Sequence, residues 1–149
     1  MGIVVDVVTM IAGIMTAVSV ILAVVFYCKD KRRSNKLATL EAYDRLQRDV
    51  LDELNRWKPQ EIREAMENPR SEEYVRLSVL LARIEHFCAG INHKIYDFDI
   101  FRDISKGYFG DRRGKLYGRI LPILEVKTGD VDSPYYSNLS KVWQRCETC

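Results

Sequence analysis

The feature that constrains this chain most is an uncharged apolar run near its N-terminus. Residues 7–28 read VVTMIAGIMTAVSVILAVVFYC, twenty-two residues with no charged side chain. A helix of that length spans about 33 Å, and the hydrocarbon core of a bilayer is about 30 Å thick. A buried helix of a soluble protein rarely keeps more than about 14 such residues. The run therefore predicts a single transmembrane helix, because an isolated segment in lipid satisfies its backbone only as a helix.

The flanks of this run predict its orientation. Asp6 precedes it, whereas residues 29–36 carry five basic side chains and one acidic side chain. The positive-inside rule then places the N-terminus outside and the rest of the chain in the cytoplasm. A cleaved signal peptide would need a basic N-terminal region, and this one is acidic. We expect a retained anchor in the inner (plasma) membrane over residues 1–28. A basic juxtamembrane linker at 29–36 then leads to a cytosolic domain at 37–149.

Small residues repeat along the apolar run at helical spacing. Four of these small residues are separated by four, three and seven positions, and this spacing places them on one stripe of a helix. Such a stripe lets two membrane helices approach closely and exchange hydroxyl hydrogen bonds. Small residues are also common in spans that do not associate. We expect the stripe to be the seam of a homo-oligomer in the bilayer. Its residues are Thr9, Gly13, Thr16 and Ala23.

Beyond the linker, apolar residues recur at a period of 3.6 and predict an amphipathic helix from residue 34 to about residue 57. Pro59 is expected to stop this helix and to begin a short second helix, which ends at Asn68 before Pro69. Charged residues occupy the other side of the first helix. Its expected core residues are Leu37, Leu40, Tyr43, Leu46, Val50, Leu51, Leu54 and Trp57.

The clearest helical pattern runs from about residue 71 to residue 96. Its apolar seam alternates steps of three and four, so it must be buried against another helix. Gly90 costs about 1 kcal/mol relative to alanine within a helix, so we expect a neighbouring backbone to approach it closely. For Glu85 and His86 we weigh a functional role against a carboxylate bonded to a tyrosine or arginine, and expect the latter. The seam residues are Tyr74, Leu77, Leu81, Ile84, Cys88, Ile91 and Ile95.

Three further helices complete an all-α prediction. The first is expected over residues 98–106, the second over residues 112–127, and the last after residue 133. No segment alternates apolar and polar side chains in the way a strand does. The expected fold is one transmembrane helix followed by a small cytosolic helical bundle. The expected caps, stops and kinks are Asp97, Gly107, Pro122, Ser133 and Pro134.

Cysteine and histidine offer little support for metal or redox chemistry. In the reducing cytosol the four cysteines are expected to remain thiols. Cys146 and Cys149 have the C-x-x-C form but lack a second pair to complete a zinc site. His86 and His93 lie two helical turns apart, about 10 Å. We expect no metal and no cofactor. We also expect no enzyme, because the sequence has no nucleophile with its base, no P-loop and no metal cluster.

Positive charge is concentrated in two places. The formal net charge is only +2, yet residues 29–36 and residues 102–119 each carry a surplus of four positive charges. The first group is expected to meet anionic lipid headgroups. The second is far along the chain and needs an explanation of its own.

Residues 106–119, here called the basic segment, have a composition that a helical bundle does not require. They include four of the eight glycines, five basic residues and three aromatic residues. Glycines let backbone N–H groups approach an anion, arginine binds phosphate bidentately, and aromatic rings stack on bases. A solvated basic turn, or a second contact with an anionic bilayer, explains the same composition. The candidate ligand-binding residues are Lys106, Tyr108, Arg112, Arg113, Lys115 and Arg119.

Three stretches of the C-terminal half carry a resemblance. They are LLARIEHFCAGINHKIYDFDIFRDI, the proline-containing LPIL, and SPYYSNLSKVWQR. Together they resemble a bacterial domain-of-unknown-function family with one N-terminal span and a helical cytosolic domain. That resemblance implies fold and topology and no activity. The layout of a short anchor, a small domain and a basic patch is also similar to the membrane effectors of type III CRISPR defence that bind cyclic oligoadenylate.

Two functions are compatible with these features. The first is an oligomeric membrane effector of bacterial antiviral defence that binds a cyclic oligonucleotide at the basic segment and signals to the membrane. A symmetric ligand on a symmetry axis needs only a few basic residues from each subunit. The second is a constitutive membrane scaffold or adaptor that recruits a protein partner through its amphipathic helices. We expect no binding of duplex nucleic acid in either case.

Overall fold

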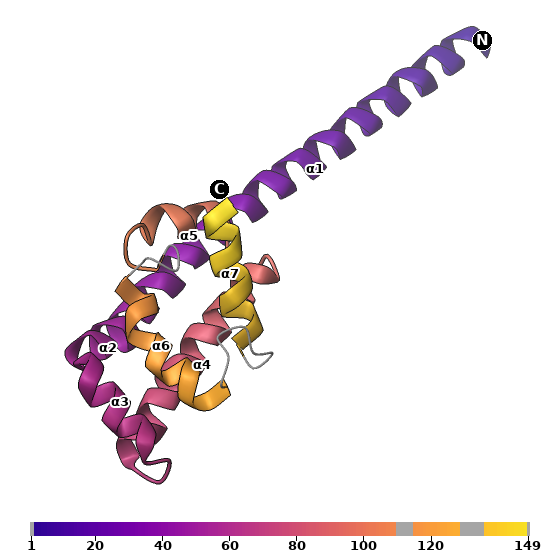
Figure 1. The fold of residues 1–149 in the computed structure, drawn as a ribbon. Helices are drawn as coiled ribbons and strands as arrows, with labels where there is room; N and C mark the ends of the chain where they lie inside the picture. The colour runs from indigo at the N-terminus through magenta and orange to yellow at the C-terminus, as the bar shows by residue number, and fades with distance from the viewer. Residues whose placement is uncertain (1, 110–114, 129–135, 149) are drawn as a thin grey trace. The chain divides into compact units, whose positions relative to one another are not determined.

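The computed structural model describes residues 2–109, 115–128 and 136–148, with side chains at 9–109, 115–121, 123 and 136–148. Within these ranges every regular element is a helix and none is a strand, as Figure 1 shows. The all-α prediction is confirmed for this part of the chain. Contacts divide the chain into two units, Met1–Asn35 and Lys36–Cys149.

The first unit consists of the N-terminal part of helix α1, which runs from Gly2 to Leu46. From residue 9 to residue 34 its described side chains are exposed. The helix that begins here is long and apolar enough to cross a membrane. Residues 29–36, expected as a linker, are helical and belong to α1. The charged side chains there are long and straight, so they favour a helix rather than break it.

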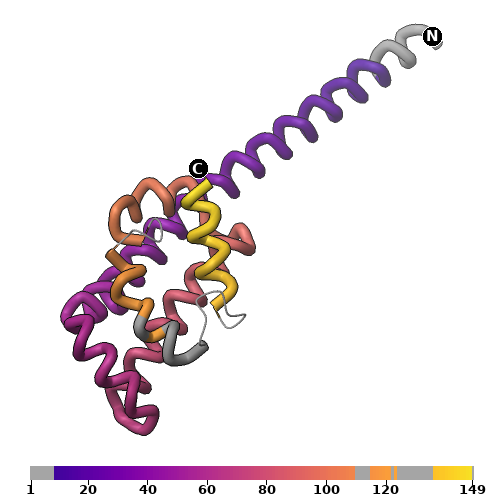
Figure 2. Tube along the Cα trace, viewed as in Figure 1, coloured from indigo at the N-terminus to yellow at the C-terminus, as the bar shows by residue number. Residues whose placement is uncertain are grey.

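The described residues of the second unit form the end of α1 and seven shorter elements. Figures 1 and 2 show their course. Helix α4 packs against α7 and α3 packs against α6, so segments far apart in sequence lie side by side. The short element η1 is a single turn of π-helix between α1 and α2. The elements are η1 (Gln47–Leu51), α2 (Asp52–Arg56), α3 (Pro59–Glu67), α4 (Glu72–Asn92), α5 (Phe98–Ile104), α6 (Lys115–Thr128) and α7 (Ser137–Thr148).

The predicted stop at Pro59 is confirmed. Helix α2 ends at Arg56, Trp57 is extended, and Pro59 is the first residue of α3. The predicted core face is only partly right, because Leu37 and Leu40 are 58% and 43% exposed. The apolar core begins six residues beyond Leu37, at Tyr43. Helical periodicity places residues on a face, but it does not say where along the helix the neighbouring elements begin.

Helix α4 has the predicted start and a shorter end. The Ser71 hydroxyl accepts a hydrogen bond from the Tyr74 N–H at 3.1 Å and caps the helix. At the other end Lys94 has φ 59°, and the N–H of Ile95 donates to the Gly90 carbonyl at 3.0 Å. This is the Schellman arrangement, which closes a helix with one left-handed residue. Ile95, predicted in the buried seam, is therefore beyond the helix and 59% exposed.

Gly90 makes the predicted close approach, but with a different neighbour. A Cβ at this position would lie 2.4 Å from Cε2 of the Tyr96 ring. The expectation of a neighbouring helix backbone was wrong, because the turn after α4 folds the Tyr96 ring back onto the helix. The ring of Tyr96 also stacks on Phe87, with centroids 5.3 Å apart. Glycine at position 90 therefore makes room for the aromatic end of the core.

Helix α5 begins as predicted, with the Asp97 carboxylate accepting from the Ile100 N–H at 3.1 Å. It ends at Ile104, two residues before the expected boundary, and Gly107 follows with φ 80°. Its Phe101 ring makes an edge contact with Phe109, at 5.1 Å between centroids. Both rings are fully buried, so the first residues of the basic segment help to form the core.

Helices α6 and α7 supply the remaining core side chains. Leu116, Ile120 and Ile123 of α6 are buried in the core. The predicted kink at Pro122 stays a prediction, because the side chain of this residue is not among the described ones. The predicted cap and first residue of the last helix, Ser133 and Pro134, lie outside the described residues. The buried α7 residues are Leu139, Val142 and Trp143.

Candidate functional site

Arg119 of the basic segment is engaged within the protein. Its Nη1 lies 2.7 to 3.3 Å from three backbone carbonyl oxygens at the C-terminal end of α2. The last carbonyls of a helix have no partner within the helix, and a cation there is favourable. Arg119 thus caps α2 and joins α6 to it. The three acceptors are the carbonyls of Leu54, Asn55 and Trp57.

The aromatic residues of the basic segment also have internal partners. Tyr108 donates its hydroxyl hydrogen to Asn55 Oδ1 at 2.8 Å, and burial raises the pKa of this phenol. Phe109 is fully buried, and its carbonyl accepts from the Trp143 indole N–H at 3.1 Å. The Tyr117 ring contacts the Trp143 ring edge-on, with centroids 5.2 Å apart. Phe109 therefore has no exposed ring face to offer a base.

Two lysines of the basic segment remain accessible. Lys106 is exposed and forms an ion pair with Asp103 at 3.2 Å, and Lys115 is exposed at the start of α6. The N–H of Leu116 donates to the carbonyl of Tyr108 at 2.9 Å, which brings the two ends of the intervening stretch together. Arg112 and Arg113 lie outside the described residues. The proposed ligand-binding set is thus split between internal contacts, exposed lysines and undescribed positions.

Glu85, a candidate functional residue, has a structural task that the sequence did not reveal. Its Oε1 accepts from the backbone N–H and the side-chain amide of Asn138, and its Oε2 accepts from the Leu139 N–H, all at 2.9 Å. The expected tyrosine or arginine partner was wrong. The carboxylate instead satisfies free N–H groups at the first turn of α7, where negative charge is favoured. Glu85 therefore fastens α7 to α4.

Among the thiols that the structure describes, Cys88 is held in an unreactive form. Cys88 is fully buried, and its pKa is raised well above the ordinary value, first by burial and then by the neighbouring Glu85 and Cys146. A thiol held in its neutral form is a poor nucleophile and a poor metal ligand. Cys28 is exposed, and Cys149 lies outside the described residues. Among the residues that the structure describes, no three metal-binding side chains come together.

The predicted oligomer seam lies on the exposed surface of α1. The hydroxyl of Thr16 donates to the Ala12 carbonyl at 2.8 Å, within the same helix. A Cβ on Gly13 would meet nothing within 4 Å. Thr9 and Ala23 are also exposed. The stripe is open to a neighbouring helix, and self-association through it stays a prediction.

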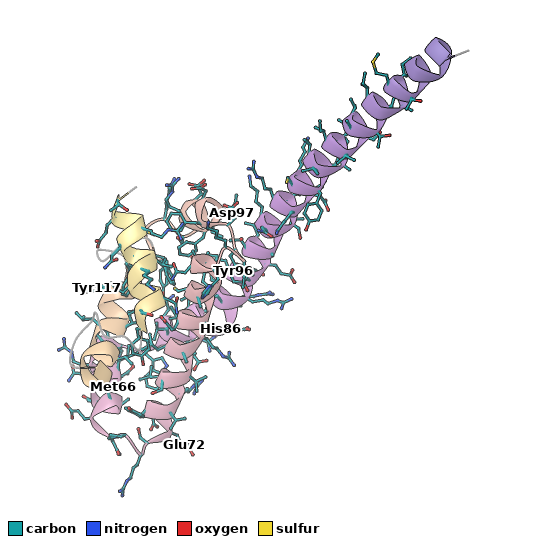
Figure 3. The ribbon with its side chains drawn as sticks, turned by 90° about the vertical axis from the view of Figure 1, so that its right-hand side faces the viewer. Met66, Glu72, His86, Tyr96, Asp97 and Tyr117 are labelled. Carbon is teal, nitrogen blue, oxygen red and sulfur yellow. The ribbon has the colours of Figure 1, made fainter. Side chains whose placement is uncertain are left out.

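One hollow of the second unit is a groove between two helical walls, here called the α1–α4 groove. Its volume is about 570 Å³. One wall is the end of α1 with η1, and the other is the middle of α4. Figure 3 labels His86 on α4 and Tyr96 on the turn that follows it. The lining residues are Ala42, Arg45, Leu46, Asp49, Val50, Val79, Ala82, Arg83, His86, Phe87 and Tyr96.

The α1–α4 groove combines an apolar floor with charged edges. Leu46, Val50 and Phe87 form buried parts of its lining, while Val79 is 46% exposed. The π-helical turn η1 contributes to one wall, and π turns often mark functional sites. Sequence reasoning missed the groove. The available signal was a second stripe on α4, in which Val75, Val79 and Ala82 repeat at steps of four and three opposite the buried seam.

No family model, no curated protein and no solved structure matches the chain. The two resemblances drawn from the sequence stay predictions.

Proposed function

We propose that the protein is a membrane-anchored adaptor without enzymatic activity. In this proposal the N-terminal helix crosses the inner membrane with its N-terminus outside, and the helical domain lies in the cytoplasm. The domain binds a helix of a partner protein in the α1–α4 groove. The groove is the observation that carries this proposal. In the basic segment, by contrast, Arg119, Tyr108 and Phe109 are engaged in contacts within the protein.

A helix is the occupant that suits such a groove. Two helical walls with an apolar floor between them provide the usual site for the apolar face of an amphipathic helix. Val79 and Ala82 present apolar surface at the edge, where a partner would cover it. Arg83 and Asp49 lie on opposite walls of the groove. These two charges are available to fix the direction of a bound helix.

Site-specific crosslinking in cells tests the docking surface. A photo-crosslinking amino acid at Ala82 is expected to give one discrete adduct, whereas the same amino acid at Leu40 gives none. Leu40 is exposed but does not line the groove. Val79→Glu is expected to abolish the Ala82 adduct, and the matched control Leu40→Glu to preserve it. An Ala82 adduct that survives Val79→Glu would remove the groove from the proposal.

Thiol labelling tests the membrane topology. In intact spheroplasts a membrane-impermeant maleimide is expected to label a Gly2→Cys variant at its N-terminus. The native thiols of Cys146 and Cys149 should react only after the membrane is permeabilised. Labelling of these C-terminal thiols in intact spheroplasts would reverse the proposed orientation. Release of the full chain by alkaline carbonate would contradict membrane insertion.

A second candidate is the effector that binds a cyclic oligonucleotide, and one observation favours it. The Leu116 N–H donates to the Tyr108 carbonyl, and Lys106 and Lys115, which lie close to these two residues in sequence, are exposed. Thermal unfolding of the full chain in detergent, with cyclic di-, tri-, tetra- and hexa-adenylate, tests this function. A ligand at 100 times its dissociation constant raises the free energy of unfolding by about 2.7 kcal/mol. A rise in the unfolding midpoint with one ring size, absent in Lys106→Ala/Lys115→Ala, supports the effector. An unchanged midpoint with every ligand excludes it.

A further inference from the structure

A second hollow lies between the C-terminal end of α4 and the outer side of α7, and every residue that lines it is polar. We call it the α4–α7 pocket. Its volume is about 470 Å³, within the range of sites that hold small molecules. It shares no residue with the α1–α4 groove or with the basic segment. The lining residues are Asn92, His93, Asn138, Lys141, Gln144, Arg145 and Thr148.

The α4–α7 pocket has a defined frame. Asn92 Nδ2 donates to the backbone carbonyl and to Oδ1 of Asn138, at 3.0 and 3.1 Å. Asn138 in turn donates to Glu85, which fastens the start of α7. Lys141, Arg145 and Thr148 follow Asn138 at steps of three, four and three, so they share one side of α7. The helix contact thus presents these side chains together, beside the end of α4.

The charged side chains that line the α4–α7 pocket are all basic. Two permanent cations, Lys141 and Arg145, and the titratable His93 line it, and no carboxylate does. The guanidinium of Arg145 lies 3.9 Å from the centre of the Phe98 ring, which holds it in a fixed plane. Neither Lys141 nor His93 has a side-chain ion pair or hydrogen bond within the described part of the chain. This differs from the basic segment, where Arg119 and Tyr108 are bonded internally.

We propose that the α4–α7 pocket binds a terminal phosphate or diphosphate group. Arg145 offers the planar fork that matches two phosphate oxygens, and Lys141 adds a compact charge. His93 donates a hydrogen from the α4 side, and Gln144 offers a side-chain amide for the rest of the ligand. The Thr148 hydroxyl donates to the Gln144 carbonyl at 3.0 Å, so it can only accept a hydrogen bond from a ligand. A soluble phosphorylated metabolite and the headgroup of a lipid such as phosphatidic acid share this chemistry. The proposal is independent of the adaptor function and places phosphate recognition away from the basic segment.

Two matched double variants test the site in the full-length protein in detergent. Lys141→Ala/Arg145→Gln removes two positive charges from the pocket, and Lys106→Ala/Lys115→Ala removes two from the basic segment. Calorimetric titration with inorganic pyrophosphate measures affinity for soluble phosphate. For flotation the protein is transferred from detergent to phosphatidylcholine nanodiscs, so that its membrane helix does not insert into the vesicles. Flotation with vesicles of phosphatidylcholine, with and without phosphatidic acid, then measures affinity for the headgroup. Lys141→Ala alone serves if the Arg145 change disturbs the fold, since Arg145 also contacts Phe98.

The expected result is binding that falls about tenfold or more in the pocket variant and changes less than about twofold in the control. Binding of pyrophosphate identifies a soluble ligand, and binding of phosphatidic acid vesicles alone identifies the lipid headgroup. An equal loss in both double variants would show general electrostatic attraction and overturn the proposal. The absence of binding to millimolar pyrophosphate and to phosphatidic acid vesicles would overturn it as well.

Discussion

The basic segment and the α4–α7 pocket are both cationic, yet they use their charge in opposite ways. In the basic segment Arg119 donates to the end of α2, and Lys106 is paired with Asp103. In the pocket Lys141 and Arg145 line a hollow that no carboxylate shares. A count of basic residues therefore measures how much charge is present, but not whether the charged side chains are already bonded within the protein. The first region is in large part structural, and the second is open to a ligand.

The largest effect that would test this contrast is expected at Phe109, near the start of the basic segment. Phe109→Ala should lower the free energy of unfolding by about 3–5 kcal/mol, because it empties a fully buried ring site. Chemical denaturation of the full chain in detergent measures the loss. Lys115→Ala, at an exposed position in the same segment, is the control and should cost less than about 0.5 kcal/mol. Equal losses at the two positions would show that the segment does not form part of the core.

Arg119→Ala is expected to lower the free energy of unfolding by about 1.5–3 kcal/mol, since it removes a charged donor from three carbonyl groups. Arg119→Lys should recover only part of the loss, because one ammonium does not reproduce the planar donor. The same denaturation measurement decides the outcome. If Arg119→Ala leaves the free energy of unfolding unchanged, the Arg119 side chain would be available to a ligand.

Alkaline pH should destabilise the protein through Cys88, which lies beside the frame of the α4–α7 pocket. The folded protein raises the pKa of this thiol, whereas the unfolded chain ionises it near the ordinary thiol value of 9.0. Stability is therefore complete below about pH 9 and falls as pH rises, by about 1.4 kcal/mol per pH unit. Cys88→Ala should flatten the curve between pH 9 and 10, below the range of the buried tyrosines. An unchanged slope in Cys88→Ala would assign the loss to other groups.

Helix ends were predictable where one side chain acts on its own neighbours. Ser71 and Asp97 bond to N–H groups three residues ahead, and Pro59 lacks a donor, so each signal is local. The buried seam of α4 followed from periodicity for the same reason. Its C-terminal end did not, because a lysine rather than a glycine takes the left-handed position at residue 94. A local rule identifies a helix end only when the usual residue type is present.

The candidate sites were harder to predict because their partners are distant in sequence. Arg119 reaches carbonyls more than 60 residues earlier, and Glu85 reaches backbone N–H groups more than 50 residues later. Backbone groups carry no sequence signature, so neither contact could be read from residue types. The exposed stripe of α4 at Val75 and Val79 was visible in principle, but it is shorter than the buried seam on the opposite face and was overlooked. The α4–α7 pocket depends on the packing of two helices and had no single motif.

The smallest expected effect concerns Lys106, and it decides whether the control in the phosphate experiment is valid. Its ion pair with Asp103 joins two highly exposed side chains, and such pairs contribute about 0–1 kcal/mol. Lys106→Ala should therefore leave the unfolding midpoint nearly unchanged, and added salt should reduce even this difference. Asp103→Ala should match it, because each change removes the same pair. A loss much larger than that at Asp103 would mean that Lys106 has a structural role, so that the basic segment would contain no freely available described cation except Lys115.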